Sequence, residues 1–139
     1  MMKSRYTPLV SVKKNIMQKS ERLLQSANAN LNSASAALQI SLEELKKIEP
    51  PKEGIISDFL SSRLLLDAQR NLIRNNEEWV IFAKSQIREA KEQLKLDMIE
   101  YEKFKSLELQ EIKERLHQEK MQEAKDLDEI ALMTFDKKR

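Results

Sequence analysis

The stretch Glu49-Pro50-Pro51-Lys52-Glu53-Gly54 separates two long segments that contain almost no helix-breaking residues. It holds two of the three prolines and the only glycine of the 139-residue chain. Proline disfavours helical geometry at the residue before it, and glycine permits the chain to reverse. Because no other strong break is present, the sequence predicts a single reversal between two helices.

The segment before this break has the pattern of a helix over residues 8–48. Thr7 is a suitable N-cap, and Pro8 fits the first helical position, where its missing N–H costs nothing. Apolar or small residues then recur at steps of three and four, which predicts one buried seam. We expect this seam to contain Leu9, Val12, Ile16, Ser20, Leu23, Ala27, Leu31, Ala34, Leu38, Leu42, Leu45 and Ile48.

The segment after the break predicts a longer helix over residues 57–132. Ser57 can cap it, and Asp58 suits the positive end of the helix dipole. Shifts of phase near Asn75-Asn76 and in residues 104–109 are interpreted as stutters of the heptad. The expected seam contains Phe59, Leu66, Ile73, Val80, Ala83, Ile87, Ala90, Leu94, Met98, Tyr101, Leu109, Ile112, Leu116, Ala124, Leu127 and Ile130.

A short loop over residues 49–56 forces the two helices to run antiparallel. The predicted fold class is therefore all-α, with a single domain over residues 1–139. This domain is a two-helix antiparallel coiled-coil hairpin whose long C-terminal helix overhangs the first. At 1.5 Å per residue the helices measure about 60 Å and about 115 Å. This register puts Pro8 opposite Leu96 or Asp97, so residues 97–132 form the overhang.

The same register predicts which side chains meet inside the hairpin. Ala27 falls opposite Trp79, so a small residue would accommodate a large ring. Asn28 and Asn30 face the region of Asn75 and Asn76, and buried Asn is a common device for fixing register in coiled coils. Trp79 and Phe82 could also anchor a partner, and the seam is the favoured interpretation for both.

Composition excludes most catalytic and ligand-binding classes. The chain has no cysteine, no Gly-rich phosphate loop and a net charge of +2, which is too small to predict nucleic-acid binding. His117 is the only histidine and lies in a charged stretch with no fixed partners. A two-helix hairpin offers no pocket for a catalytic pair of carboxylates. We therefore expect no enzyme activity, no catalytic residue, no cofactor or metal site and no small-molecule substrate.

Two terminal features bear on location and partners. The start of the sequence lacks the apolar core of a signal peptide, and no window reaches the length of a membrane span. We expect the basic end Lys137-Lys138-Arg139 to be a frayed helix terminus. In the expected overhang, apolar residues keep helical spacing without a partner in the chain, which predicts binding to another protein or self-association.

Both ends of the sequence resemble one protein family. The opening Tyr6-x-x-Leu9-x-x-Val12-Lys13, with Glu21-Arg22-Leu23-Leu24 after it, resembles the first helix of the FliJ family. The ending Lys125-Asp126-Leu127-Asp128-Glu129-Ile130-Ala131 resembles that family's charged C-terminal helix. The order helix, loop, long helix matches as well. The Asn/Ser/Ala-rich middle and the Pro-Pro loop depart from the family pattern.

This resemblance implies a bacterial component of the flagellar type III protein export apparatus, with a role in flagellum biogenesis and motility. Family members resemble the central stalk of rotary ATPases. They bind the hexameric export ATPase ring, the cytoplasmic part of the membrane-embedded export gate and export chaperones. The implied location is cytoplasmic, peripherally at the inner-membrane export apparatus. The implied ring-facing residues are Tyr6, Leu9, Lys13, Ile112, Leu116, Leu127 and Ile130.

The residues alone also support a second hypothesis. A structural coiled coil that forms a homodimer through its C-terminal helix would bury the same apolar stripe. Binding to the export ATPase would distinguish the two hypotheses.

Overall fold

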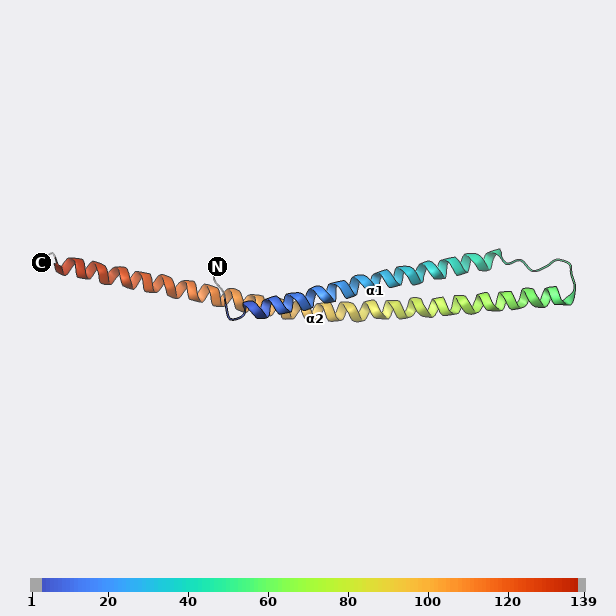
Figure 1. Ribbon diagram of the computed structural model, residues 1–139, viewed down its shortest axis with the longest axis horizontal. Coiled ribbons are helices and arrows are strands. Elements are labelled where there is room, and N and C mark those ends of the chain that lie inside the picture. The colour runs from blue at the N-terminus through green and yellow to red at the C-terminus, as the bar shows by residue number, and fades with distance from the viewer. Residues whose placement is uncertain (1–3, 138–139) are drawn as a thin grey trace. The chain divides into compact units, whose positions relative to one another are not determined.

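The computed structural model describes residues 4–137, which form two helices, α1 (Thr7–Lys47) and α2 (Ile56–Lys137), with no strand among them. The helices run antiparallel (Figure 1). The predicted all-α hairpin with a longer second helix is therefore confirmed. Each helix begins one residue earlier than predicted, and α2 continues to Lys137 instead of ending near residue 132. Residues 138 and 139 of the predicted basic end lie outside the described residues.

The chain divides into two compact units, and both helices contribute to each. Unit 1 contains Met1–Met17 and Leu96–Arg139, and unit 2 contains Gln18–Lys95. The loop between α1 and α2 belongs to unit 2. Each unit is therefore a pair of antiparallel helix segments, and the described part of the chain has no other packed layer.

The start of α1 is organised by Ser4 rather than by Thr7 alone. The Tyr6 N–H donates to Ser4 Oγ at 3.0 Å, and the Ser4 N–H donates to Thr7 Oγ1 at 3.0 Å. These two bonds form a reciprocal capping arrangement. The first α-helical bond then runs from Val10 N–H to the Tyr6 carbonyl. The predicted N-cap role of Thr7 is corrected, because its hydroxyl bonds back to Ser4 instead of forward into the helix.

Gly54 has the backbone conformation that the sequence predicted for the reversal. Its φ is +150°, and a Cβ at this position would lie 2.7 Å from Asp58 Oδ2. Asp58 lies in the first turn of α2, as predicted, where a carboxylate stabilises the positive end of the helix dipole. Glycine is favoured here chiefly by the positive φ, since the Asp58 carboxylate that a Cβ would meet is the end of a side chain that can move.

The seam of unit 2 follows an uninterrupted heptad on both helices. Seam residues are buried or half-buried, and steps of three and four alternate between them. On α1 they are Ser20, Leu24, Ala27, Leu31, Ala34, Leu38, Ser41, Leu45 and Ile48. On α2 they are Ser62, Leu66, Gln69, Ile73, Asn76, Val80, Ala83, Ile87, Ala90 and Leu94. Most of the predicted seam is confirmed, but Leu23, Leu42 and Phe59 are exposed.

The spacing of this seam corrects the predicted stutter at Asn75-Asn76. Gln69 and Asn76 occupy regular seam positions, so the phase of the heptad does not change there. Without these two residues, Leu66, Ile73 and Val80 still follow one another at steps of seven, which is the same heptad. The polar residues therefore change the chemistry of the seam and not the geometry of the helix.

Polar seam residues of α1 and α2 bond to one another in a single layer. Gln69 Nε2 donates to the Ser41 carbonyl at 2.8 Å, and Asn76 Nδ2 lies 3.1 Å from Ser41 Oγ and 3.2 Å from the Ala37 carbonyl. The Ser41 hydroxyl donates to the Leu38 carbonyl at 2.8 Å. A shift of one helix along the other would leave these half-buried groups without partners, so the layer fixes the register.

The observed register differs from the predicted one. Asn76 lies beside Ala37 and Ser41, not beside Asn28 and Asn30. The cause is the loop: Pro50 and Pro51 lie against the first turns of α2 and line a groove with Phe59, Ser62, Arg63, Leu66, Asp67 and Arg70. Proline favours extended backbone, so the loop runs along the first turns of α2 beyond the end of α1. The predicted pairing of Ala27 with Trp79 is wrong for this reason, because Ala27 lies beside Gln86 and Ala90.

We expect Asn76→Ala to lower the free energy of unfolding by about 1 to 2 kcal/mol, because two hydrogen bonds are lost at a half-buried position. Urea unfolding followed by circular dichroism measures this. Asn28→Ala is the matched control: Asn28 is exposed, and the change should stay within about 0.5 kcal/mol. Equal effects of the two substitutions would contradict the register described above.

We expect Gly54→Ala to lower the free energy of unfolding by about 1 to 2 kcal/mol, because alanine resists the positive φ and its methyl group meets Asp58. The neighbouring control Glu53→Ala should change it by less than about 0.5 kcal/mol. A neutral Gly54→Ala in the same urea experiment would show that the turn relaxes without cost.

Candidate protein-binding site

The residues predicted to face a partner all lie in unit 1, where the beginning of α1 packs on α2. Val10 is buried at this contact, and the Tyr6 and Phe104 rings lie with their centroids 6.5 Å apart at an interplanar angle of 48°. A tilted pair of rings at this distance is favourable beyond the area it buries. The amino-terminal segment is therefore fixed to α2 by apolar and aromatic contacts.

The heptad of unit 1 also runs without a stutter. On α1 the positions that continue the heptad are Val10, Lys13 and Met17, each buried or half-buried. On α2 they are Asp97, Tyr101, Phe104, Glu108 and Glu111, which are also buried or half-buried. The predicted seam residues Leu9, Val12, Ile16, Met98 and Leu109 are exposed instead. The predicted stutter within residues 104–109 is corrected, because charged side chains occupy seam positions there.

Glu111 joins the two helices at the end of this contact. Its Oε2 lies 3.3 Å from Arg5 Nε, and its Oε1 accepts from the Arg5 N–H at 3.4 Å and from Arg115 Nη2 at 3.1 Å. The hydrogen bond from Arg5 to the Tyr6 hydroxyl and, after it, the charge of Glu111 raise the pKa of the Arg5 guanidinium from its already high ordinary value. Arg5 therefore stays charged at every pH at which the protein folds.

A second charged contact lies about two helical turns farther along the chain, at Lys13. Lys13 Nζ is 3.5 Å from Glu100 Oε2 and 5.6 Å from the centroid of the Phe104 ring. Lys103 lies 5.8 Å from the centroid of the same ring, and Lys105 pairs with the buried Glu108 at 3.3 Å. The rim of unit 1 is thus a set of alternating charges around an aromatic pair.

The last part of α2 extends beyond its contact with α1. Every residue from 113 to 136 is exposed, whereas residues 111 and 112 are still half-buried. We call residues 113–137 the overhang. It begins well beyond residue 97, the start that the sequence predicted, because α1 lies farther along α2. The large apolar side chains of the overhang are Leu116, Met121, Leu127, Ile130, Leu132, Met133 and Phe135.

The structure brings only part of the predicted site together. Tyr6 and Lys13 are half-buried and meet at Phe104. Leu9 is exposed beside them, and Ile112 is half-buried at the last contact between the helices. Leu116, Leu127 and Ile130 lie on the overhang, apart from this cluster. The role of these residues in binding stays a prediction.

Sequence reasoning missed the residues that hold the cluster together. Arg5, Phe104 and Glu111 were not predicted as site residues, although they make its closest contacts. Glu111 was missed because apolar periodicity does not include a charged residue, even one at a seam position. The one available signal was the heptad counted through polar residues, which places Phe104 and Glu111 on the same face as Tyr101.

Other residues singled out in the sequence have no built site around them. His117 is exposed on the overhang. In residues 4–137 no group of three or more His, Cys, Asp or Glu side chains is placed to hold a metal ion. Neither described helix contains an apolar stretch of membrane-spanning length. Trp79 and Phe82 are 41% and 61% exposed, so the prediction that they fill the seam is wrong.

We expect Glu111→Ala to loosen the beginning of α1, because Arg5 loses its carboxylate partner. Exposed ion pairs contribute less than about 1 kcal/mol, so amide hydrogen exchange of residues 5–10 should become about two- to fivefold faster. Glu114→Ala, an exposed substitution on the same helix, should leave these amides unchanged. Unchanged exchange in Glu111→Ala would mean that the aromatic contact alone holds this segment.

Comparison with known proteins agrees with this architecture. The family model described as Flagellar FliJ protein matches residues 2–139. A solved structure from Chlamydia trachomatis, of a protein described as a YscO homologue, is similar with a TM-score of 0.77 and 21% identity. The similarity covers 98% of this chain and 96% of that chain, and at this identity it shows the fold. No curated protein matches the sequence. The family predicted from the two ends of the sequence is confirmed: the chain belongs to the FliJ family of coiled-coil proteins of flagellar type III export.

Proposed function

We propose that this chain acts, as a single coiled-coil domain, as a stalk or adaptor in flagellar type III protein export. In this proposal it binds the export ATPase ring, the cytoplasmic part of the export gate and export chaperones. Membership of the FliJ family supports the assignment to export. The observation that carries the stalk role is the overhang of α2, which presents apolar side chains to solvent over its whole length.

The overhang needs a partner for a physical reason. In proteins, packing of an apolar stripe supplies most of a helix's stability, and the overhang does not pack on α1. Leu116, Leu127 and Ile130 are all exposed at helical spacing, and charged residues lie between them. A narrow helix of this kind fits between subunits of a ring, where it would bury its stripe and keep its charges at the rim.

The charged rim of unit 1 supports contacts that form and break quickly. Arg5, Lys13 and Glu100 are at least partly exposed, so their pairs are open to exchange with charges of a neighbouring protein. Electrostatic complementarity contributes to the rate and specificity of association more than to affinity. A stalk that meets several ring subunits in turn needs contacts with these properties.

In this proposal the export gate and the chaperones bind the half of the hairpin nearest the loop. Ile55, Ile56, Phe59, Leu60 and Leu64 are exposed there, and Ile56 is 77% exposed. Exposed apolar patches of this kind are typical of protein-binding surfaces. These partners would hold the chain on the cytoplasmic side of the inner membrane, at the export apparatus.

A second candidate function rests on the same overhang. Two copies of α2 could bury their apolar stripes against each other, which would make the chain a structural coiled coil that forms a homodimer through its C-terminal helix. The experiment below separates this candidate from the stalk, because only the stalk requires the ATPase.

We expect the full-length protein to bind the export ATPase of the same organism and to stimulate its ATP hydrolysis. A variant truncated after Lys113 should lose both, because it lacks the overhang but keeps every described contact between α1 and α2. Truncation at Leu96 would be less informative, because it also removes Phe104 and Glu111 and exposes Val10. Pull-down and a phosphate-release assay measure the two effects.

A point substitution tests the overhang without shortening it. We expect Leu127→Glu to weaken ATPase binding about tenfold, because it places a charge in the apolar stripe. Leu64→Glu is the matched control: it is equally exposed but lies near the loop, so ATPase binding should not change. If full-length protein neither binds nor stimulates the ATPase, the stalk role fails. Self-association that the truncation abolishes would then favour the second candidate.

A further inference from the structure

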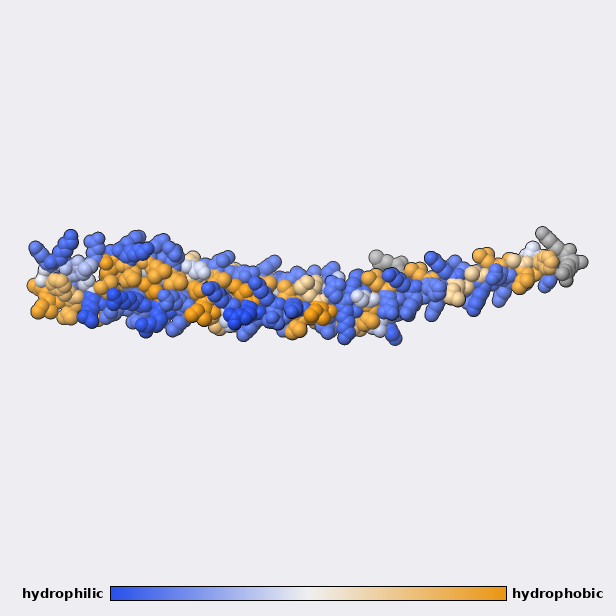
Figure 2. All heavy atoms as spheres, turned by 180° about the vertical axis from the view of Figure 1, so that it is seen from behind, coloured by the Kyte–Doolittle hydropathy of each residue, from blue (hydrophilic) through white to orange (hydrophobic). Residues whose placement is uncertain are grey.

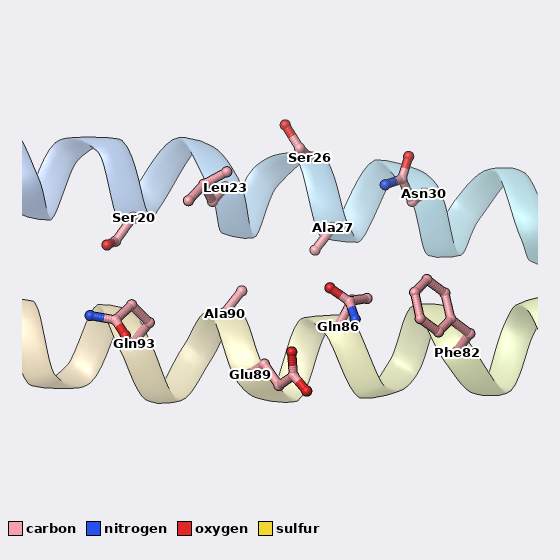
Figure 3. A pocket seen from close by; sticks show the side chains of 10 residues that line it. All are labelled: Ser20, Leu23, Ser26, Ala27, Asn30, Phe82, Gln86, Glu89, Ala90 and Gln93. Atoms are coloured by element: carbon pink, nitrogen blue, oxygen red, sulfur yellow. The ribbon is translucent and has the colours of Figure 1, made fainter.

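A second row of residues lies beside the buried seam on each helix of unit 2. Each residue of a row comes one position before a seam residue. Leu23 and Asn30 of α1 line the same open groove as Phe82, Gln86 and Glu89 of α2 (Figure 3). The two rows therefore lie on one side of the hairpin, as expected for equivalent flanking positions of an antiparallel coiled coil. We call this side the row face.

The row face is apolar and exposed in unit 2. Its large side chains are Leu23, Ile40, Leu65, Leu72, Trp79 and Phe82, each of them exposed. The residues that follow the α2 seam positions lie on the other side and are mostly basic. The basic ones are Arg63, Arg70, Arg74, Lys84, Arg88, Lys91 and Lys95, and the others are Asp67, Glu77 and Ile81. Apolar side chains also gather over the helix pair near the loop in the space-filling view (Figure 2). The asymmetry marks the row face as an interaction surface.

The α1 row is complementary to its own reverse, because residues equally far from its two ends can pair with each other. Its outer members are oppositely charged, its next members are large and aliphatic, and its central members are small or polar. In chain order the row contains Lys19, Leu23, Ser26, Asn30, Ser33, Ala37, Ile40 and Glu44. A second copy that ran antiparallel across this row would place Lys19 against Glu44, Leu23 against Ile40 and Asn30 against Ser33.

The inner part of the α2 row has the same property. Trp79 and Phe82 lie at its centre, with Asn75 before them and Gln86 after them. An antiparallel copy would place Trp79 against Phe82 and Asn75 against Gln86. These are an aromatic pair and an amide pair, which can stack and exchange hydrogen bonds respectively. Farther out, Leu72 would meet Glu89, whose carboxylate stays at the rim of the contact.

The centres of the two rows lie opposite each other in the hairpin. The hydrogen bond from Asn76 to the Ala37 carbonyl fixes where α1 and α2 meet. The centre of the α1 row lies before Ala37 in the chain, and the centre of the α2 row lies after Asn76, at nearly the same number of residues from the bond. One two-fold axis across the row face can therefore relate both rows to their counterparts in a second copy.

We propose that the row face binds a second copy of this chain, antiparallel and around that two-fold axis, so that α1 lies on α1 and α2 on α2. The rows extend from Lys19 to Glu44 on α1, about 37 Å of helix, and the hairpin is about 20 Å wide. This surface approaches the roughly 800 Å² per partner of a specific interface. The dimer is distinct from self-association through the overhang, which uses another part of α2.

Charge supports a second copy as the occupant. Neither Lys19 nor Glu44 has an ion-pair partner among residues 4–137, and both are exposed. Across the two-fold axis each lies against the other, so the dimer contains two such pairs at its rim. Rim pairs of this kind select the partner and its orientation.

Sedimentation velocity of the full-length protein over a range of micromolar concentrations tests this proposal. We expect a monomer–dimer equilibrium. Phe82→Ser should weaken the dimer at least tenfold with unchanged helix content by circular dichroism, because Phe82 lies near the axis and is exposed in the monomer. Ile81→Ser, an exposed neighbour on the other side of α2, should leave the equilibrium unchanged. The variant truncated after Lys113 should still dimerise.

Charge exchange tests the antiparallel arrangement itself. Lys19→Glu and Glu44→Lys should each weaken the dimer about three- to tenfold, because like charges then meet at both rims. An equimolar mixture of the two variants should recover wild-type affinity, since every rim pair of the mixed dimer is again opposite in charge. A monomer at all concentrations, a dimer insensitive to Phe82→Ser, or a mixture that does not recover would each overturn the proposal.

Discussion

The hydrogen-bonded layer of Gln69, Asn76 and Ser41 is the constraint on which the rest of the structure depends. The surrounding seam alternates aliphatic residues with small ones such as Ala27, Ala34 and Ala83, and this apolar pattern repeats every heptad and so is compatible with several registers. The polar layer removes this freedom, because a slipped helix would bury amide and hydroxyl groups without partners. The loop is compatible with that register, since its prolines lie along the first turns of α2 beyond the end of α1.

The register decides what the two sides of the hairpin offer to other proteins. In unit 2 it aligns the Leu23 and Ile40 row with the Trp79 and Phe82 row, and leaves the basic residues of α2 on the other side. In unit 1 it brings Tyr6 to Phe104 and Arg5 to Glu111. The overhang then starts where this contact ends. One set of buried polar contacts thus sets the positions of the row face, the charged rim and the exposed overhang.

The candidate site was only partly accessible to sequence reasoning. The helical pattern and the family resemblance identified Tyr6, Lys13 and the overhang residues Leu116, Leu127 and Ile130. The residues that hold the amino-terminal segment, Arg5, Phe104 and Glu111, were missed, because two of them are charged and the third was assigned to a stutter. Charged residues at seam positions carry the same heptad as apolar ones, but hydrophobic periodicity does not count them.

The sequence by itself determined that the chain forms two helices with one reversal, because Pro50, Pro51 and Gly54 are the only clustered helix breakers and the flanking segments repeat every three and four residues. It also determined the family. Only the tertiary structure decided which of two adjacent apolar stripes is buried. Leu9, Val12, Ile16 and Leu23 form a helical stripe as regular as that of Val10, Met17 and Leu24, and the two differ by one position. The choice between them depends on which polar groups find partners across the seam, and that pairing involves residues far apart in the chain.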